Sequence, residues 1–272
     1  MKPAAFDYVR ADTLDEAVAL LREHGDGGRV LAGGQSLMPL LNMRLAAPAL
    51  LIDISRIAAL DYARVEGDRL CVGAACTQAG VEWRPQLTTE VPLLALALPH
   101  VSHFQIRNRG TVCGSIAHAD PSAELPLVLT ALGGEVVLRS ARGTRALGAD
   151  AFFQGLLTTA RAADELVEAV RFPLRQAGCG YGFTEMAQRH GDFALVACAA
   201  VVSAGEVRLA VGGASDRPRL VRWPRLPMAE LYAALNDFAW VLDARDDPHA
   251  SARYRRHLVR QLGRRAIEEA CR

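Results

Sequence analysis

Two short glycine-containing segments carry the residue types that a phosphate site needs, and the first is Ala32-Gly33-Gly34-Gln35-Ser36. It ends a short apolar run that is typical of a strand. Because glycine has no Cβ, Gly33 and Gly34 allow positive φ angles and a close approach of the backbone to a ligand. Successive N–H groups in such a turn form an anion site, and a pyrophosphate is its natural occupant. A tight turn that needs glycine only for its geometry would give the same pattern.

The second segment is Gly110-Thr111-Val112-Cys113-Gly114-Ser115. The hydroxyls of Thr111 and Ser115 can donate hydrogen bonds to phosphate oxygens. Residues 103–120 are rich in polar residues and glycine and lack helical periodicity, so we expect ordered loops around a short strand. Two such loops would hold a dinucleotide from both sides.

A polar run from His118 to Glu124 continues the second segment. Asp120 and Glu124 can accept hydrogen bonds from ribose or ribityl hydroxyls. His118 either lies near a cofactor or stabilises the loop through a hydrogen bond of its imidazole. For the other histidines we expect surface or structural roles.

Several other cofactor sites are disfavoured by the sequence. No window matches the G-x-G-x-x-G pattern of a Rossmann site or the G-x-x-x-x-G-K-[ST] pattern of a P-loop. The cysteines lack the clustered spacing that zinc or iron–sulfur sites require, so we expect reduced structural thiols and no metal on this chain. These cysteines are Cys71, Cys76, Cys113, Cys179, Cys198 and Cys271.

The charge balance excludes other partners. Lysine and arginine total 31 against 30 for aspartate and glutamate, so the net charge of +1 provides no field to attract nucleic acid. No apolar run approaches the roughly 20 residues that span a bilayer, and the start, Met1-Lys2-Pro3, has no apolar signal core. We therefore expect a cytoplasmic protein with no membrane span. A content of 51% hydrophobic residues predicts a packed core.

The elements around the first segment are predicted to form a compact α/β unit. Thr13 and Glu16 make a capping-box pattern in front of an amphipathic helix over residues 14–24. The apolar residues 50–54 predict a buried strand. Farther along, the patterns predict a hairpin (62–66 with 69–72), a helix (122–132) and two strands (135–138 and 165–172).

A change of domain is predicted near residue 176. The stretch 173–182 contains Gly178, Gly180 and Gly182, which is typical of a domain junction. Beyond it, residues 181–186, 194–203 and 206–211 predict an antiparallel meander. The tail, residues 250–271, predicts a basic amphipathic helix whose arginines mainly form a solvated face. Its expected apolar face consists of Tyr254, Leu258, Leu262, Ala266 and Ala270.

Longer strings make the chain recognisable. The strings Leu31-Ala32-Gly33-Gly34-Gln35-Ser36-Leu37, Gln105-Ile106-Arg107-Asn108-Arg109-Gly110-Thr111 and Gly114-Ser115-Ile116-Ala117-His118-Ala119-Asp120-Pro121-Ser122-Ala123-Glu124 occur in this order. Together they resemble the medium, FAD-binding subunits of the carbon monoxide dehydrogenase and xanthine dehydrogenase family, the molybdenum hydroxylases. The resemblance continues through Arg189-His190-Gly191-Asp192-Phe193-Ala194 and the terminal Tyr254-Arg255-Arg256-His257-Leu258.

The resemblance implies an α+β fold with two domains. Residues 1–176 would form a two-lobed FAD-binding domain of the vanillyl-alcohol-oxidase (PCMH) type, with lobes over about 1–56 and 57–176. Residues 177–272 would form the C-terminal flavoprotein domain, a three-stranded antiparallel sheet with helices.

The resemblance also implies roles for individual residues. The FAD pyrophosphate would be held by both glycine segments, and Asp120 or Glu124 would bind sugar or ribityl hydroxyls. Leu166 would make an apolar contact, and Phe193 would approach the isoalloxazine ring. The implied FAD-binding set is Ala32, Gly33, Gly34, Gln35, Ser36, Thr111, Gly114, Ser115, His118, Asp120, Glu124, Leu166 and Phe193, with no catalytic residue. Cys113 departs from the family, which usually has glycine there, and a positive φ at this position would weaken FAD binding.

The implied activity is that of a flavoprotein subunit in a heteromeric molybdenum hydroxylase. It would pass electrons from [2Fe–2S] clusters of a partner chain through FAD to an external acceptor. An iron–sulfur small subunit and a molybdopterin large subunit would be its partners, in a dimer of heterotrimers. Two alternatives stay open: a self-sufficient FAD oxidoreductase of the same fold, and a flavin-free assembly module. The substrate and the acceptor are not readable from this chain.

Overall fold

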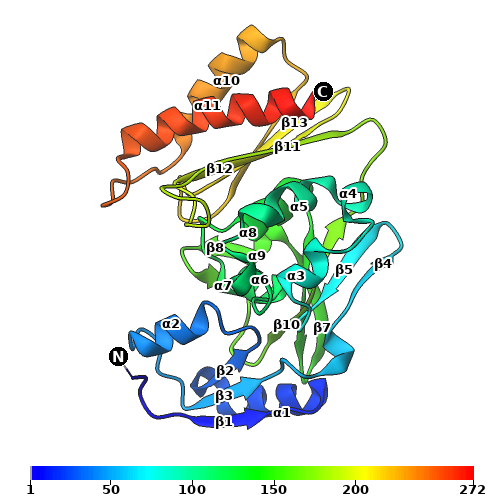
Figure 1. Ribbon diagram of the computed structural model, residues 1–272, viewed down its shortest axis with the longest axis vertical. Coiled ribbons are helices and arrows are strands. Elements are labelled where there is room, and N and C mark those ends of the chain that lie inside the picture. The colour runs from blue at the N-terminus through cyan, green and yellow to red at the C-terminus, as the bar shows by residue number, and fades with distance from the viewer. Residues whose placement is uncertain (1) are drawn as a thin grey trace.

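The chain folds into three large β-sheets that follow one another along the sequence, as Figure 1 shows for the computed structural model, which describes residues 2–272. The first sheet lies at the bottom of this view and the third at the top. Helices cover each sheet, and the two long C-terminal helices lie over the outer face of the third. The N-terminal part of the chain is thus farthest from the C-terminal helices.

The first sheet is parallel, with β3 between β1 and β2. Its elements are β1 (Asp7–Arg10), α1 (Leu14–His24), β2 (Gly28–Leu31), α2 (Leu37–Asn42) and β3 (Leu50–Asp53). Thr13 caps α1 by accepting a hydrogen bond from the Glu16 N–H at 3.1 Å, which confirms the predicted start of this helix. The predicted buried strand over residues 50–54 is confirmed as β3, whose four residues are all buried.

The second sheet is antiparallel, in the order β4-β5-β10-β6-β7. Its strands are β4 (Ala63–Glu66), β5 (Arg69–Gly73), β6 (Glu135–Ser140), β7 (Gly143–Gly148) and β10 (Leu166–Pro173). The helices that accompany it are α3 (Gln78–Glu82), α4 (Leu87–Glu90), α5 (Pro92–Ala97), α6 (Phe104–Arg107), α7 (Val112–His118), α8 (Glu124–Leu132) and α9 (Ala149–Phe152). A small hairpin joins β8 (Phe153–Gly155) to β9 (Thr158–Thr159). The predicted hairpin, helix and strands of this region are confirmed.

The third sheet is antiparallel and has four strands, so the expected three-stranded sheet is wrong. Its strands are β11 (Gly180–Met186), β12 (Val196–Val202), β13 (Glu206–Gly212) and β14 (Arg219–Pro224), and its helices are α10 (Met228–Val241) and α11 (Ala252–Ala270). The additional strand is β14, which lies at the edge of the sheet. This strand has two arginines, a terminal proline and no buried residue, as is typical of an edge strand. It therefore lacks the alternation of apolar and polar residues that would have predicted it.

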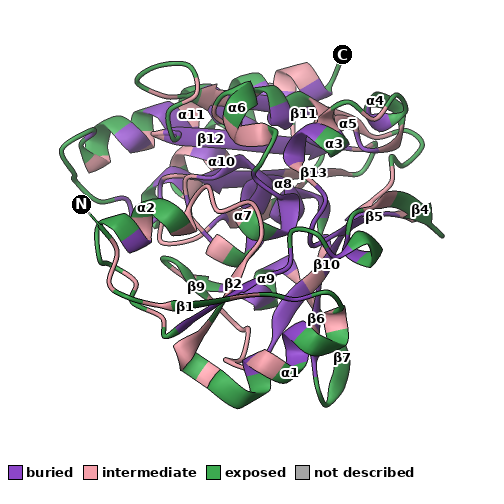
Figure 2. Ribbon diagram, turned by 60° about the horizontal axis from the view of Figure 1, so that its bottom comes forward, coloured by how far each residue is buried: buried purple, intermediate pink, exposed green. Residues whose placement is uncertain are grey.

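Two hydrophobic cores explain why β12 is buried along its whole length. Alternate residues of a strand point to opposite faces of the sheet. Ala197 and Ala199 belong to the larger core, which they share with the first two sheets, whereas Val196 and Cys198 pack against α10 and α11 in the smaller core. Figure 2 shows this burial in β12 and in α8. All residues of α8 are buried, because the helix contacts β10 on one side and β12 and β13 on the other. The third sheet is therefore packed on both faces.

The glycines near the expected domain junction serve packing. Gly180 and Gly182 lie within β11, where a Cβ would overlap the backbone carbonyl of Ala270 or of Ala266 in α11. Gly178 alone has a positive φ, +74°, with open space around it. The junction reading is therefore wrong for Gly180 and Gly182, which let strand and helix approach closely. The division near residue 176 stays a prediction.

Two further expectations need correction. Residues 103–120 form the short helices α6 and α7, and their only strand-like feature within the described chain is an isolated bridge between Thr77 and Thr111. Helices of four and seven residues are too short to show a periodic pattern. On α11, Tyr254 is exposed, while Arg255 is buried beside Leu258.

Among the helices of residues 2–272, none has the length and apolar character needed to cross a membrane.

Candidate functional site

The first glycine segment forms an open turn between β2 and α2. Gly34 has a φ of +73°, and the Gln35 side chain closes the turn by donating from Nε2 to the Gly33 carbonyl at 2.9 Å. Within residues 2–272, no protein acceptor engages the backbone N–H groups of residues 33–36. Four successive N–H groups without a protein acceptor, beside a left-handed glycine, are the donors that an anion nest needs.

The two glycine segments are packed against each other. A Cβ at Gly33 would lie 2.7 Å from the Gly110 Cα and would overlap the Arg109 carbonyl. Behind the second segment, the Gln78 N–H donates to the Gly110 carbonyl at 2.8 Å. Gly33 is therefore needed for the contact between the segments, and Gly34 for the shape of the turn. The sequence had left open whether these glycines serve a ligand or only the geometry of a tight turn, and it did not indicate the contact between the two segments.

The second segment is the start of helix α7. Thr111 is its N-cap residue and accepts a hydrogen bond from the Gly114 N–H at 2.9 Å. A Cβ at Gly114 would lie 2.7 Å from the Thr111 Oγ1, so glycine is needed beside this cap. Gly114 is exposed and Ser115 is half-buried, which leaves this side of the helix start accessible. Backbone donors at a helix start suit an anion.

Cys113 does not disturb the second segment. It lies within α7 without a positive φ, and its buried thiol donates to the Val72 carbonyl in β5 at 3.4 Å. Burial, followed by the charge of Cys76, raises the pKa of the Cys113 thiol, so the group stays protonated. The expected steric penalty at this position is therefore wrong, because the side chain points into the core.

The polar run after α7 contains two half-buried candidates. Asp120 accepts a hydrogen bond from the Ser122 N–H at 2.8 Å through Oδ1. Burial lowers the pKa of His118, although the Asp120 charge opposes this shift, so the imidazole is neutral near pH 7. None of the described residues forms a hydrogen bond with that imidazole, so the loop-stabilising bond is not formed by the protein itself.

Glu124 lies deeper than its predicted role requires. It is 4% exposed at the start of α8, and burial raises its pKa to about 7. Burial and the charge of Glu124 raise the pKa of Glu185, on β11, to about 8. The Glu185 Oε2 is buried and has no hydrogen-bond partner among the described residues. Sequence reasoning missed Glu185, whose only signal is an acidic residue in an otherwise uncharged strand.

The two remaining candidates lie in contrasting places. Leu166 begins β10 and is 1% exposed, within the larger core. Phe193 lies in the segment between β11 and β12 and is 62% exposed, so its ring is free to pack against a flat ligand. In the same segment, Gly191 lies against the His103 imidazole in front of α6. The structure therefore brings this segment to the region between the second and third sheets.

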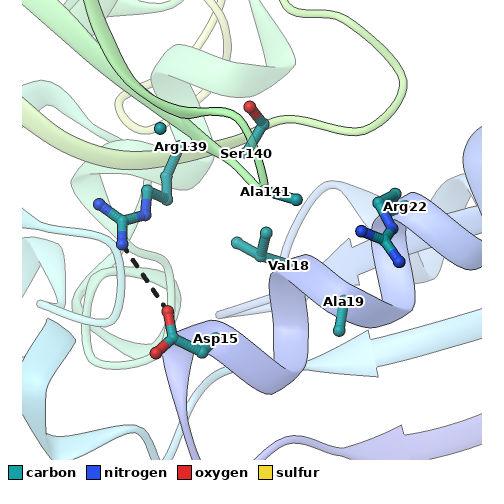
Figure 3. A pocket seen from close by; sticks show the side chains of 8 residues that line it. Asp15, Val18, Ala19, Arg22, Arg139, Ser140 and Ala141 are labelled. Atoms are coloured by element: carbon teal, nitrogen blue, oxygen red, sulfur yellow. Dashed lines mark ion pairs between the residues drawn. The ribbon is translucent and has the colours of Figure 1, made fainter.

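Figure 3 shows a pocket of about 290 Å³ that lies elsewhere, between α1 and the β6–β7 hairpin. Asp15 and Arg139 pair across it at 3.7 Å, and Arg22 lines its other side. None of the glycine-segment residues lines this pocket. Among residues 2–272, no group of three or more histidine, cysteine or acidic side chains is placed to hold a metal ion.

Comparison with known proteins gives a consistent result. Residues 4–175 match the family model described as the FAD binding domain in molybdopterin dehydrogenase. The nicotine 6-hydroxylase medium subunit of Paenarthrobacter nicotinovorans is 39% identical, with 99% of both chains covered. The caffeine dehydrogenase subunit beta of Pseudomonas sp. (strain CBB1) is 43% identical over 77% of this chain and 71% of that subunit.

Solved structures extend the likeness to the whole chain. A chain of carbon monoxide dehydrogenase from Hydrogenophaga pseudoflava has a TM-score of 0.94 at 31% identity and covers 100% of this chain and 99% of its own length. A chain of quinoline 2-oxidoreductase from Pseudomonas putida 86 has a TM-score of 0.91 at 33% identity and covers 99% and 98%. The chain therefore belongs to the FAD-binding subunits of the molybdenum hydroxylase family and is an FAD-dependent oxidoreductase subunit.

Proposed function

We propose that this chain is the electron-relay subunit of its complex, which takes electrons from [2Fe–2S] clusters of a partner chain and passes them through FAD to an external acceptor. Bound FAD would supply the ability to accept electrons singly and release them as a pair. The observation that carries the proposal is the open nest of four backbone N–H groups at residues 33–36, packed against the start of α7. A doubly charged pyrophosphate is a fitting ligand for these donors.

Residue roles follow from donor type and from position around the two glycine segments; Thr111, which is 4% exposed, would act mainly as the cap of α7. The nest formed by Ala32 to Ser36, with Thr111, Gly114 and Ser115, would bind the pyrophosphate. Asp120 would accept hydrogen bonds from sugar or ribityl hydroxyls through its remaining oxygen, and His118 would lie beside it. Phe193 would pack against the ring system and Leu166 would support it from the core. Glu124 is the weakest of the polar acceptors because its carboxyl is buried and its pKa is raised to about 7.

The proposed assembly contains an iron–sulfur small subunit and a molybdopterin large subunit, in a dimer of heterotrimers. Relatives named as medium subunits, such as the carbon monoxide dehydrogenase medium chain of Hydrogenophaga pseudoflava, support a multi-subunit complex. Relatives named for nicotine, caffeine, glyceraldehyde and carbon monoxide all resemble this chain. We infer that the substrate is selected on the molybdenum chain. A cytoplasmic location stays a prediction.

The substitution Gly34→Val tests the proposed pyrophosphate site. Valine at a φ of +73° is strained, and its branched side chain would obstruct the nest. We expect the purified variant to retain less than about a tenth of the wild-type FAD, since losing three or four hydrogen bonds to a charged group weakens binding by more than tenfold. FAD released on denaturation is measured per protein chain.

Gly67→Val is the matched control. Gly67 also has a positive φ, +61°, but lies in the β4–β5 turn with open space around it. It therefore carries the same backbone strain without touching the nest, and its FAD content should equal that of the wild type. A folded Gly34→Val variant with full FAD would refute the site, and the isolated chain oxidising a substrate unaided would favour the self-sufficient alternative.

A further inference from the structure

One arginine of the basic helix α11 is buried while its neighbours in the sequence are more exposed. Arg255 is 6% exposed, and its Nη1 donates to the Leu195 carbonyl at 2.5 Å and to the Gly213 carbonyl at 2.8 Å. Its Nη2 donates to the Asp247 carboxylate. One guanidinium thus joins three segments that are distant in sequence, and its position is fixed by the rigid helix that carries it.

Asp247 is held in place as the counter-charge of Arg255. Its Oδ1 accepts hydrogen bonds from the backbone N–H groups of His249 and Ala250, each at 2.9 Å. Burial works to raise the pKa of Asp247, but these backbone hydrogen bonds and the Arg255 charge outweigh it and lower the pKa. The carboxylate is therefore ionised at neutral pH and pairs with the guanidinium.

The two carbonyls that Arg255 holds lead toward the flavin-site candidates. Leu195 is the last residue of the segment between β11 and β12 that carries Phe193. Gly213 donates its N–H to the Pro121 carbonyl at 2.8 Å, and Pro121 directly follows Asp120. Gly213 also has a φ of +77°, and a Cβ there would lie 2.6 Å from the Leu195 carbonyl oxygen. The two segments therefore meet at Gly213 and are fastened together by Arg255.

We propose that Arg255 is a positioning residue of the FAD site, which sets the Phe193 segment and the Asp120 loop at a fixed distance through Leu195 and Gly213. This inference rests on the proposed function, because it assumes that Phe193 and Asp120 face the cofactor. Arg255 itself touches no cofactor atom in this account. Its effect is on the ring and sugar end of FAD, whereas Gly34 acts on the pyrophosphate.

The test compares Arg255→Met, Arg255→Lys and Asp247→Asn in the full chain, with Arg265→Met as the matched control. Arg265 lies on the same helix, is exposed and pairs only with Glu269 among the described residues. The readouts are the visible circular dichroism of bound FAD and the dissociation constant for FAD. We expect Arg255→Met to change the dichroism and to raise the constant by about tenfold, the size of one charge-assisted hydrogen bond lost between FAD and the displaced Asp120 carboxylate. Arg255→Lys and Asp247→Asn should give intermediate values.

Arg265→Met should match the wild type in both readouts. Thermal unfolding identifies the variants that are folded at the measuring temperature. If Arg255→Met does not fold, Asp247→Asn, which keeps the arginine in place, tests the positioning role instead. Folded Arg255 and Asp247 variants with wild-type dichroism and FAD affinity would overturn the inference. If Gly34→Val also keeps its FAD, the proposed pyrophosphate site has failed independently of Arg255.

Discussion

The residues closest to the candidate site show how far chemistry can be read from residue types. The glycine pair, Thr111 and Asp120 were singled out because glycine, hydroxyl and carboxylate groups suit a dinucleotide. The sequence did not reveal that Gly33 is required by the Gly110 backbone, nor that Arg255 and the Oε2 atom of Glu185 are buried. These facts depend on contacts between residues far apart in the chain, which no local pattern encodes.

At the same scale, the buried acids predict a pH dependence of stability. The folded protein raises the pKa of Glu185 from 4.5 to about 8, mainly through burial, so it binds a proton that the unfolded chain has released. The contribution of Glu185 to the free energy of unfolding is therefore complete below about pH 4.5 and is lost as the pH rises toward 8. The charge of Glu124 also raises the pKa of Glu185, and the pKa of Glu124 is raised in turn by the charge of Asp120 and lowered by that of Arg107.

Glu185→Gln removes this loss because the amide does not ionise. We expect the stability advantage of the variant over the wild type to be greater at pH 8 than at pH 5 by roughly 3 kcal/mol, as measured by urea unfolding at both pH values. The control is Glu230→Gln, at an exposed position of α10. An equal difference between wild type and Glu185→Gln at both pH values would show that Glu185 does not titrate as proposed.

Among the elements, those with strong local signals were predicted correctly. The capped helix α1 and the long helix α11 have periodic apolar residues, and the β4–β5 hairpin has a Gly-Asp turn. The short helices α6 and α7 and the edge strand β14 were not predicted, because their stability comes from caps and neighbours. The glycines of β11 were misassigned because close packing and flexibility favour the same residue.

The contact between β11 and α11 predicts a large effect at Gly182. An alanine Cβ there would overlap the Ala266 carbonyl, a backbone atom that cannot move without shifting the helix. We expect Gly182→Ala to lower the free energy of unfolding by about 3 kcal/mol, in the range for overpacking a core. Gly205→Ala, in the open β12–β13 turn, should change it by less than about 0.5 kcal/mol. Urea unfolding compares the two, and equal effects would refute the packing role.

For the whole molecule, we propose that substrate chemistry and electron transfer lie on different chains of the complex. The described residues include no metal-binding group and present an open anion nest beside exposed and half-buried polar groups. Family membership rests on similarity over nearly the whole chain, so it concerns the complete fold and not only the glycine segments. The α+β class could be predicted from the sequence, whereas the packing of α8 between two sheets could not.

Anaerobic reduction of the flavin tests the central claim most directly. The visible absorption of FAD is followed after substrate is added, once with the isolated chain and once with the complex purified together with its partner chains. We expect bleaching of the flavin band in the complex and an unchanged band in the isolated chain. Bleaching of the isolated chain by the same substrate, or an oxidised flavin in a complex whose iron–sulfur clusters have been reduced, would contradict it.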